Sequence, residues 1–211
     1  MRVKAVNGSP KATDSTSERI IKQVERLFGY KIEVYRAKQL IKEATSLEII
    51  QEILNSDALL IVFPLYVDSL PAPLIELLTM LESASEHIMA KPKVYAIVNA
   101  GFFEAEQNKA ALEMIEHFAK RLQLPWGYGI GIGGGGMLSS MGDDWSKGPV
   151  SGIYHEIAEL ATAIRNNSSR ENIFISPKIP RLVYKLAADL GMRRIAKQSG
   201  VKNIRARPYT E

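Results

Sequence analysis

Hydroxyl side chains gather near the start of the sequence, between an apolar run at residues 3–6 and a helical pattern. Residues 7–17 read Asn-Gly-Ser-Pro-Lys-Ala-Thr-Asp-Ser-Thr-Ser. Hydroxyls and backbone N–H groups bind phosphate oxygens, and the macrodipole of a following helix adds partial positive charge. The segment therefore has the composition of a phosphate-binding loop. Ser15 and Glu18 also have the spacing of a capping box, so an ordinary helix start is an equally good interpretation of this loop alone.

The spacing within this loop excludes two common nucleotide-binding motifs. It lacks the Gly-x-x-x-x-Gly-Lys-Ser/Thr pattern of nucleoside triphosphatases, for which Lys11 stands too early, and it lacks Gly-x-Gly-x-x-Gly. A loop with hydroxyls in place of glycines can enclose one terminal phosphate but suits a pyrophosphate poorly. The pattern therefore favours a mononucleotide such as FMN.

Apolar runs alternate with helical patterns along the first 166 residues. Runs that are apolar throughout, such as Ala58–Phe63, are typical of strands buried on both faces of a parallel sheet. The alternation predicts an α/β fold with a doubly wound five-stranded parallel sheet in the flavodoxin-like order 2-1-3-4-5. The expected strands are residues 2–6, 31–36, 58–63, 93–98 and 126–132, and the expected helices are residues 15–27, 45–55, 74–85, 104–122 and 152–166.

In this architecture ligands bind at the carboxyl ends of strands 1, 3 and 4. The segments that follow the third and fourth expected strands read Pro-Leu-Tyr-Val-Asp-Ser-Leu-Pro at 64–71 and Asn-Ala-Gly-Phe-Phe-Glu at 99–104. Tyr66 and Phe102 are expected to flank a planar ring, and Gly101 to let the backbone approach it. Core packing explains each aromatic residue taken singly. Three suitable loops at one sheet edge together predict a site for a flat, phosphorylated ligand.

These three segments resemble the flavodoxin-like NAD(P)H-dependent FMN reductase superfamily, which includes the flavodoxin-fold part of iron–sulfur flavoproteins. The resemblance rests on Gly8–Lys11 with Ser15–Ser17, on Pro64–Tyr66 with Ser69–Pro71, and on Asn99–Phe102, and it extends over residues 1–166. It implies an FMN site whose phosphate is held by Ser9, Lys11, Ser15, Thr16 and Ser17. The same resemblance implies that the isoalloxazine lies against Pro64, Leu65, Tyr66, Val67, Asn99, Ala100, Gly101 and Phe102.

The resemblance also implies an oxidoreductase in which NADPH or NADH reduces FMN and the electrons pass to a flavin, quinone or similar small acceptor. The flavin carries this chemistry, so no catalytic residue is assigned. Backbone N–H groups of Asn99–Phe102 are candidates for stabilising negative charge on the reduced ring. The alternative is an FMN-bound electron-transfer protein without its own nicotinamide site, or a flavin-binding protein without turnover. A homodimer or homotetramer is implied as well.

The composition limits the remaining chemistry. The chain has 211 residues and no cysteine, which excludes disulfides, thiolate catalysis and the cluster of iron–sulfur flavoproteins. Its histidines, His87, His117 and His155, are scattered without metal-ligand spacing, so no metal site is predicted. The sequence shows no signal peptide and no apolar run long enough to span a membrane, and a cytoplasmic location is expected.

The net charge of +4 is unevenly distributed along the chain. Residues 177–211 contain nine Lys/Arg and two Asp/Glu, so the basic character belongs to this end. We assign residues 1–167 to the FMN-binding domain and residues 168–211 to a basic, mainly helical extension. Residues 179–198 have helical spacing, with Leu182, Leu186, Leu190 and Ile195 expected on one face. Packing on the domain or on a neighbouring subunit is favoured; an anionic partner is the alternative, and nucleic acid is not expected.

A glycine-rich stretch covers residues 129–136, Gly-Ile-Gly-Ile-Gly-Gly-Gly-Gly. Its first half is expected to end the fifth strand. The remainder has high backbone freedom, and two interpretations stay open. Residues up to Trp145 form either a mobile flap, with Trp145 covering the flavin, or a disordered connector.

Overall fold

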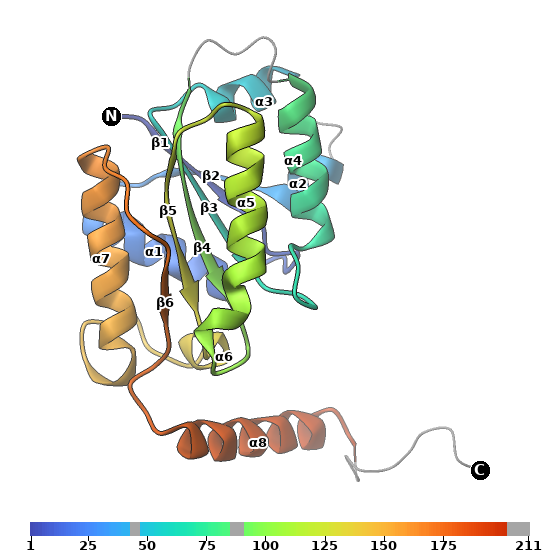
Figure 1. The fold of residues 1–211 in the computed structure, drawn as a ribbon. Coiled ribbons are helices and arrows are strands. Elements are labelled where there is room, and N and C mark those ends of the chain that lie inside the picture. The colour runs from blue at the N-terminus through green and yellow to red at the C-terminus, as the bar shows by residue number, and fades with distance from the viewer. Residues whose placement is uncertain (43–46, 85–90, 202–211) are drawn as a thin grey trace. The chain divides into compact units, whose positions relative to one another are not determined.

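The structure is a computed structural model that describes residues 1–42, 47–84 and 91–201. The chain divides into two compact units, Met1–Lys178 and Ile179–Glu211. The first unit is built on a parallel sheet in the order β2-β1-β3-β4-β5-β6 (Figure 1). Its strands are β1 Val3–Asn7, β2 Glu33–Arg36, β3 Ala58–Pro64, β4 Lys93–Asn99, β5 Trp126–Ile132 and β6 Ile173–Ile175.

Helices cover both faces of this sheet, as the doubly wound prediction requires. They are α1 Thr16–Phe28, α2 Ala37–Lys42, α3 Leu47–Leu54, α4 Ala72–Ala84, α5 Lys109–Arg121, α6 Gly135–Leu138 and α7 Ser151–Arg165. Helix α2 was not expected from the sequence, and the predicted helix 104–122 is divided into the 3-10 turn η2 (Ala105–Asn108) and α5. The start of the predicted helix 45–55, the last residue of the predicted helix 74–85 and His87 lie outside the described residues.

The sheet has six strands where the sequence patterns predict five. Strand β6 pairs in parallel with β5, from Ile130 opposite Ile173 to Ile132 opposite Ile175. It falls within residues 168–211, where an extension of mainly helical character was expected. A run of three apolar residues is too short to show the periodicity that identifies a strand.

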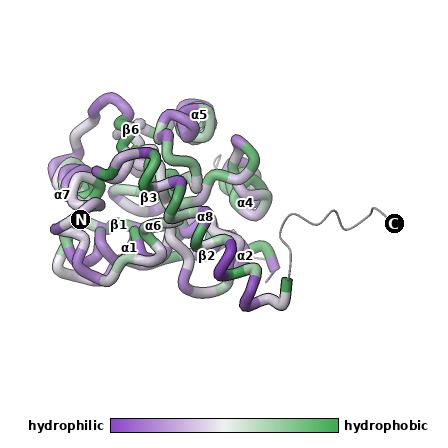
Figure 2. The backbone as a smooth tube through the Cα atoms, turned by 90° about the horizontal axis from the view of Figure 1, so that it is seen from below, coloured by the Kyte–Doolittle hydropathy of each residue, from purple (hydrophilic) through white to green (hydrophobic). Residues whose placement is uncertain are grey.

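The apolar side chains of the strands form two cores, one on each face of the sheet. Along β3, Leu60 and Val62 belong to the core beneath α1 and α7, whereas Leu59, Ile61 and Phe63 belong to the core beneath α4 and α5. Figure 1 shows these helices on the two faces, and Figure 2 shows β3 as hydrophobic while α5 and α7 carry hydrophilic outer turns. The sheet is thereby fixed from both faces, and its carboxyl edge can hold loops in defined positions.

Glycines in β5 let side chains of α5 and β6 pack closely against this strand. A Cβ on Gly129 would lie 2.5 Å from Leu112 Cδ2, and one on Gly131 would lie 2.6 Å from Phe174 Cδ1. Real Cβ atoms do not show such distances, so an alanine at either position would force Leu112 or Phe174 to move. Along β5 these glycines alternate with Tyr128, Ile130 and Ile132, which point into the opposite core and are fully buried.

The second unit contains helix α8, Arg181–Gln198, close to the predicted range 179–198. None of its residues is buried. At about 100° of rotation per residue, Leu182 and Leu190 lie within about 80° of each other, but Ile195 lies about 140° from Leu182. Ile195 therefore does not share the apolar face that was predicted for it together with the leucines. None of the helices in the described part of the chain combines the length and apolar character needed to cross a bilayer.

Candidate functional site

Three loops meet at the carboxyl edge of the sheet, where the sequence places the predicted site. The strand register sets Asn7 opposite Val62, and Pro64 opposite Asn99. Backbone hydrogen bonds continue this order into the loops: Gly8 N donates to Val62 O at 2.9 Å, and Leu65 N donates to Asn99 O at 2.9 Å. The loops after β1, β3 and β4 therefore start from one rigid base.

Asn99 joins the sheet to the start of helix α1. Its side chain is buried, and Nδ2 donates to Phe63 O at 3.0 Å and to Ser17 Oγ at 3.3 Å. A single amide thus connects the end of β4, the end of β3 and the first turn of α1. Asn99 acts as a positioning residue for the loops, because its amide hydrogens are already used within the protein.

The loop after β1 folds so that donors at the start of α1 stay available. Ser15 caps the helix, since its Oγ accepts from Glu18 N at 3.1 Å. Thr16 N–H and Ser17 N–H belong to the first helical turn and have no intrahelical partner. Neither these two groups nor the Thr16 hydroxyl makes a hydrogen bond within the described residues. Helix capping and anion binding are therefore compatible here.

Three cations hold carbonyl groups of the same loop. Lys38 Nζ donates to Pro10 O at 2.8 Å, Lys11 Nζ donates to Asp14 O at 3.0 Å, and Arg36 Nη1 donates to Ala12 O. Alternate carbonyl oxygens are thus occupied by cations, which compensates their partial negative charge. What remains exposed to a ligand is the donor side of the loop, which suits a phosphate.

The acidic side chains near the loop are each paired with a cation. Asp14 has φ +50° and bonds Arg19 Nε at 2.9 Å, and Arg19 holds the pKa of the Asp14 carboxyl below its ordinary value. Burial alone would raise the pKa of Glu18, but a hydrogen bond from Lys22 and the charge of Arg36 lower it overall. These pairs weaken the repulsion that free carboxylates would exert on a bound phosphate.

The loop after β3 exposes apolar side chains in a strained turn. Leu65 is buried in the core, whereas Tyr66 is 48% exposed and Val67 is 97% exposed. Tyr66 and Ser69 exchange two backbone hydrogen bonds of 3.0 and 3.1 Å, which force Val67 to φ +50° and Asp68 to φ +58°. A β-branched residue at positive φ is an outlier of the kind that gathers at ligand sites. Of the predicted ring contacts here, Tyr66 and Val67 are the accessible ones.

The loop after β4 offers fewer donors than the sequence suggested. Ala100 is buried and its N–H donates to Ile132 O at 2.8 Å, so the prediction that this N–H stabilises a reduced ring is wrong. Phe102 is 58% exposed, and its N–H makes no hydrogen bond in the part of the chain that the structure describes. Phe102 therefore supplies both an accessible ring and an available donor.

The glycine-rich stretch supports this loop from beneath instead of covering the site. Gly133 to Gly135 are buried, and Gly134 N and Gly135 N donate to Phe102 O at 2.5 Å and Ala100 O at 2.7 Å. Trp145 is 1% exposed in the core beneath α1 and α7. The interpretation in which Trp145 covers the flavin is therefore wrong, and the packed glycines do not fit a disordered connector. Glycine is required because the two backbones touch.

Residues 1–126 match the family profile described as NADPH-dependent FMN reductase. The chain belongs to this family. The membership confirms the predicted resemblance, an oxidoreductase with FMN as cofactor and a nicotinamide nucleotide as electron donor. Available donors at the start of α1 and exposed rings at the same edge fit FMN. No match was found among curated protein sequences.

Solved structures similar to this FMN reductase family member share its fold. An NADH:FMN oxidoreductase, in its apo form, has a TM-score of 0.59 at 15% identity, covering 81% of this chain and 91% of that one. An NADPH-quinone reductase from P. pentosaceus has a TM-score of 0.54 at 15% identity, with coverages of 76% and 98%. General stress protein 14 from Treponema denticola, solved with FMN, has a TM-score of 0.51 at 14% identity, with coverages of 79% and 97%.

Sequence reasoning missed the residues that shape the phosphate loop from outside it. Arg36 ends β2 and Lys38 lies in α2, more than twenty residues after the carbonyls that they bind. Asn7 was also missed, although its Oδ1 accepts from Ser9 N at 3.0 Å. A signal was present in the sequence. A polar residue, Asn7, closes a buried strand, and one cation stands at the end of β2 while the other lies two residues later. The contact between them requires the parallel pairing of β1 with β2.

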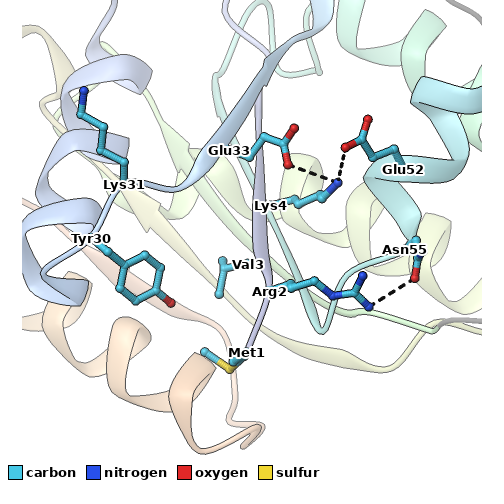
Figure 3. A pocket seen from close by; sticks show the side chains of 9 residues that line it. All are labelled: Met1, Arg2, Val3, Lys4, Tyr30, Lys31, Glu33, Glu52 and Asn55. Carbon is cyan, nitrogen blue, oxygen red and sulfur yellow. Dashed lines mark hydrogen bonds and ion pairs between the residues drawn. The ribbon is translucent and has the colours of Figure 1, made fainter.

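A cavity of about 490 Å³ lies at the opposite, amino edge of the sheet. Figure 3 shows Lys4 there between the carboxylates of Glu33 and Glu52, each 3.2 Å from Nζ. The Lys4 side chain is only 8% exposed, and Nζ also donates to the Tyr35 hydroxyl at 3.1 Å. A hydrogen bond from Tyr35, together with Lys4, holds the pKa of Glu33 below its ordinary value. Because Lys4 is fully engaged with protein groups, this cluster stabilises the β1–β2 edge.

Proposed function

We propose that this FMN reductase family member uses bound FMN to pass electrons from NADPH or NADH to a small acceptor such as a flavin or quinone. The observation that carries the proposal is the meeting of available donors at the start of α1 with exposed rings from two other loops. A phosphate and a flat ring joined by a short chain need both features at one sheet edge.

The phosphate end is assigned to the loop after β1. Thr16 and Ser17 donate through their backbone N–H groups, and the Thr16 hydroxyl adds a further donor. The Ser9 hydroxyl and the charge of Lys11 complete the anion site, while Ser15 maintains the helix start. Lys11 acts on the phosphate through its charge, since its Nζ donates to Asp14 O.

The ring end is assigned to Pro64–Val67 and Asn99–Phe102. Tyr66, Val67 and Phe102 are the exposed apolar members, and they exclude water from the ring. The hydrogen bond from Gly134 N to Phe102 O holds the backbone at Phe102 in place. The Phe102 N–H donates to the polar edge of the ring in this proposal. When bound, FMN supplies the hydride and electron chemistry, and the protein supplies position and polarity. A second copy of the chain over the exposed side chains would give the predicted homo-oligomer.

Anaerobic reduction tests this function directly. The purified protein is expected to be yellow and to lose its flavin absorbance rapidly with NADPH or NADH. Bleaching by dithionite alone would favour the electron-transfer alternative. A colourless protein that does not take up FMN would refute both.

Thr16→Val tests the phosphate assignment without disturbing the fold. The Thr16 hydroxyl makes no internal hydrogen bond within the described residues, so the free energy of unfolding should stay within about 0.5 kcal/mol of wild type. Loss of a hydrogen bond to a charged phosphate should weaken FMN binding by about 1.5–3 kcal/mol. The matched control is Thr162→Val on α7, whose hydroxyl bonds only its own helix at Ala158 O. Equal FMN affinity in the two variants would reject the assignment.

A further inference from the structure

Strand β6, which the sequence patterns did not predict, ends against the loop that follows β4. Ser176, the first residue after β6, donates from its Oγ to Phe103 O at 2.5 Å. Gly133 lies between the two segments, and its N–H donates to Ile175 O at 2.9 Å. A Cβ on Gly133 would lie 2.2 Å from Phe103 O and 2.8 Å from Ser176 Oγ. The end of β5, the end of β6 and the loop after β4 are therefore in direct contact.

The carbonyl groups of the loop after β4 are held by these neighbours, whereas one of its donors stays available. Backbone N–H groups of the glycine stretch hold the carbonyls of Ala100 and Phe102, and the Ser176 hydroxyl holds the carbonyl of Phe103. The Phe102 N–H makes no hydrogen bond in the part of the chain that the structure describes. Acceptors of this loop are thus engaged within the protein, and a donor remains for a ligand.

Ser176 differs from the glycine contacts because it uses a side chain. A hydroxyl donor can be removed without changing the backbone, and β6 lies at the edge of the described sheet, beside β5 (Figure 1). The match to the family profile ends at residue 126, so Ser176 also lies outside the matched region. A substitution at this position can therefore alter the loop after β4 while the rest of the sheet keeps its pairing.

A fixed loop matters most for the reduced form of a flavin. Reduction adds negative charge to the ring, and a donor stabilises this charge fully only when it is already aimed at the ring. A loop that must first rearrange loses part of that stabilisation. Because the oxidised ring lacks the added charge, loosening the loop should weaken the binding of reduced FMN more than the binding of oxidised FMN.

We propose that Ser176 is a positioning residue that holds the loop after β4 in the shape in which the Phe102 N–H favours reduced over oxidised FMN. The inference rests on the proposed function, in which this N–H donates to the polar edge of the ring. Ser176 does not touch the ring in this role. It acts through Phe103 O, one residue after the donor.

Ser176→Ala tests the proposal through the midpoint potential of bound FMN, measured anaerobically against a reference dye. Loss of one hydrogen bond should weaken the binding of reduced FMN about two- to tenfold, while the affinity for oxidised FMN changes less than twofold. The potential should accordingly fall by about 10–30 mV, since a tenfold change corresponds to about 30 mV for a two-electron couple. Ser176→Thr keeps a hydroxyl and should restore the wild-type potential.

Ser169→Ala is the matched control, because Ser169 Oγ also donates to a backbone carbonyl, that of Trp126 at 3.0 Å, where β5 begins at the amino edge. Both alanine variants should lower the Tm by about 2–4 °C, and only Ser176→Ala should shift the potential. An unchanged potential in Ser176→Ala, an equal shift in Ser169→Ala or Ser176→Thr, or equal weakening of oxidised and reduced FMN would overturn the proposal. Failure of the reductase function looks different, since the wild-type protein would then take up no FMN or would not be bleached by either nucleotide.

Discussion

Three glycine-to-alanine substitutions separate support of the ring loop from contact with the ring. A Cβ on Gly135 would lie 2.9 Å from Ala100 O and 3.1 Å from Asn99 Oδ1. A Cβ on Gly101 or on Gly142 would meet nothing within 4 Å, and neither residue has a positive φ. Gly135→Ala therefore disturbs the protein itself, while Gly101→Ala adds a methyl group that only a bound ligand can meet.

The magnitudes follow from these distances. Gly135→Ala pushes against a backbone oxygen that cannot rotate away, so we expect a loss of about 1–3 kcal/mol in the free energy of unfolding. Gly101→Ala and Gly142→Ala should be neutral or stabilising by up to about 1 kcal/mol, because alanine restricts the unfolded chain. If the flavin approaches the Gly101 backbone, its Cβ should weaken FMN binding by about 1–3 kcal/mol, roughly five- to 150-fold.

Two measurements separate stability from FMN affinity. Urea unfolding of the FMN-free proteins gives the free energy of unfolding, and fluorescence titration with FMN gives the affinity. The expected pattern is a loss of stability and affinity in Gly135→Ala, a loss of affinity alone in Gly101→Ala, and neither in Gly142→Ala. Unchanged FMN affinity in Gly101→Ala would refute the ring assignment at this loop. A fully stable Gly135→Ala would refute the role of the glycine stretch as a support.

Other substitutions test strain and the charge cluster at the amino edge. Val67→Gly should raise the free energy of unfolding by about 1 kcal/mol, because glycine adopts φ +50° without penalty, and thermal unfolding measures this gain. The same substitution should weaken FMN binding, which titration measures. Lys4→Met should lower the free energy of unfolding by about 1–2 kcal/mol. This loss is smaller than for a fully buried ion pair, because the side chains of Glu33 and Glu52 are 52% and 53% exposed. The lowered pKa of Glu33 gives stability that is present above its ordinary value of 4.5 and lost as the pH falls through the lowered folded value. Lys4→Met should accordingly flatten the decline of Tm between about pH 5 and pH 3.

The sequence predicted the centre of the sheet because β3 and β4 are almost continuous apolar runs. Residues 58–63 and 94–98 contain no charged side chain, and a parallel sheet is the architecture that buries both faces. The sixth strand escaped because Ile173–Ile175 is short and its identity depends on pairing with β5. The site loops were found for the same reason as the strands: each follows a recognisable apolar run.

Glycine was the residue type that sequence reasoning interpreted least well. Repeated glycines indicate either backbone freedom or close approach, and these lead to opposite predictions for mobility. Gly133 to Gly135 are of the second kind, which only the neighbouring carbonyls of Ala100 and Phe102 reveal. Those carbonyls lie more than thirty residues away in the chain, so no local pattern could distinguish the two cases.

The loop after β1 shows how distant residues can prepare a site for an anion. Its carbonyl oxygens bind Arg36 at the end of β2 and Lys38 in α2, which leaves the N–H groups at the start of α1 available. Under the proposed function, these N–H groups bind the flavin phosphate. The two cations then act on the phosphate indirectly, because they hold the loop in the shape that presents its donors.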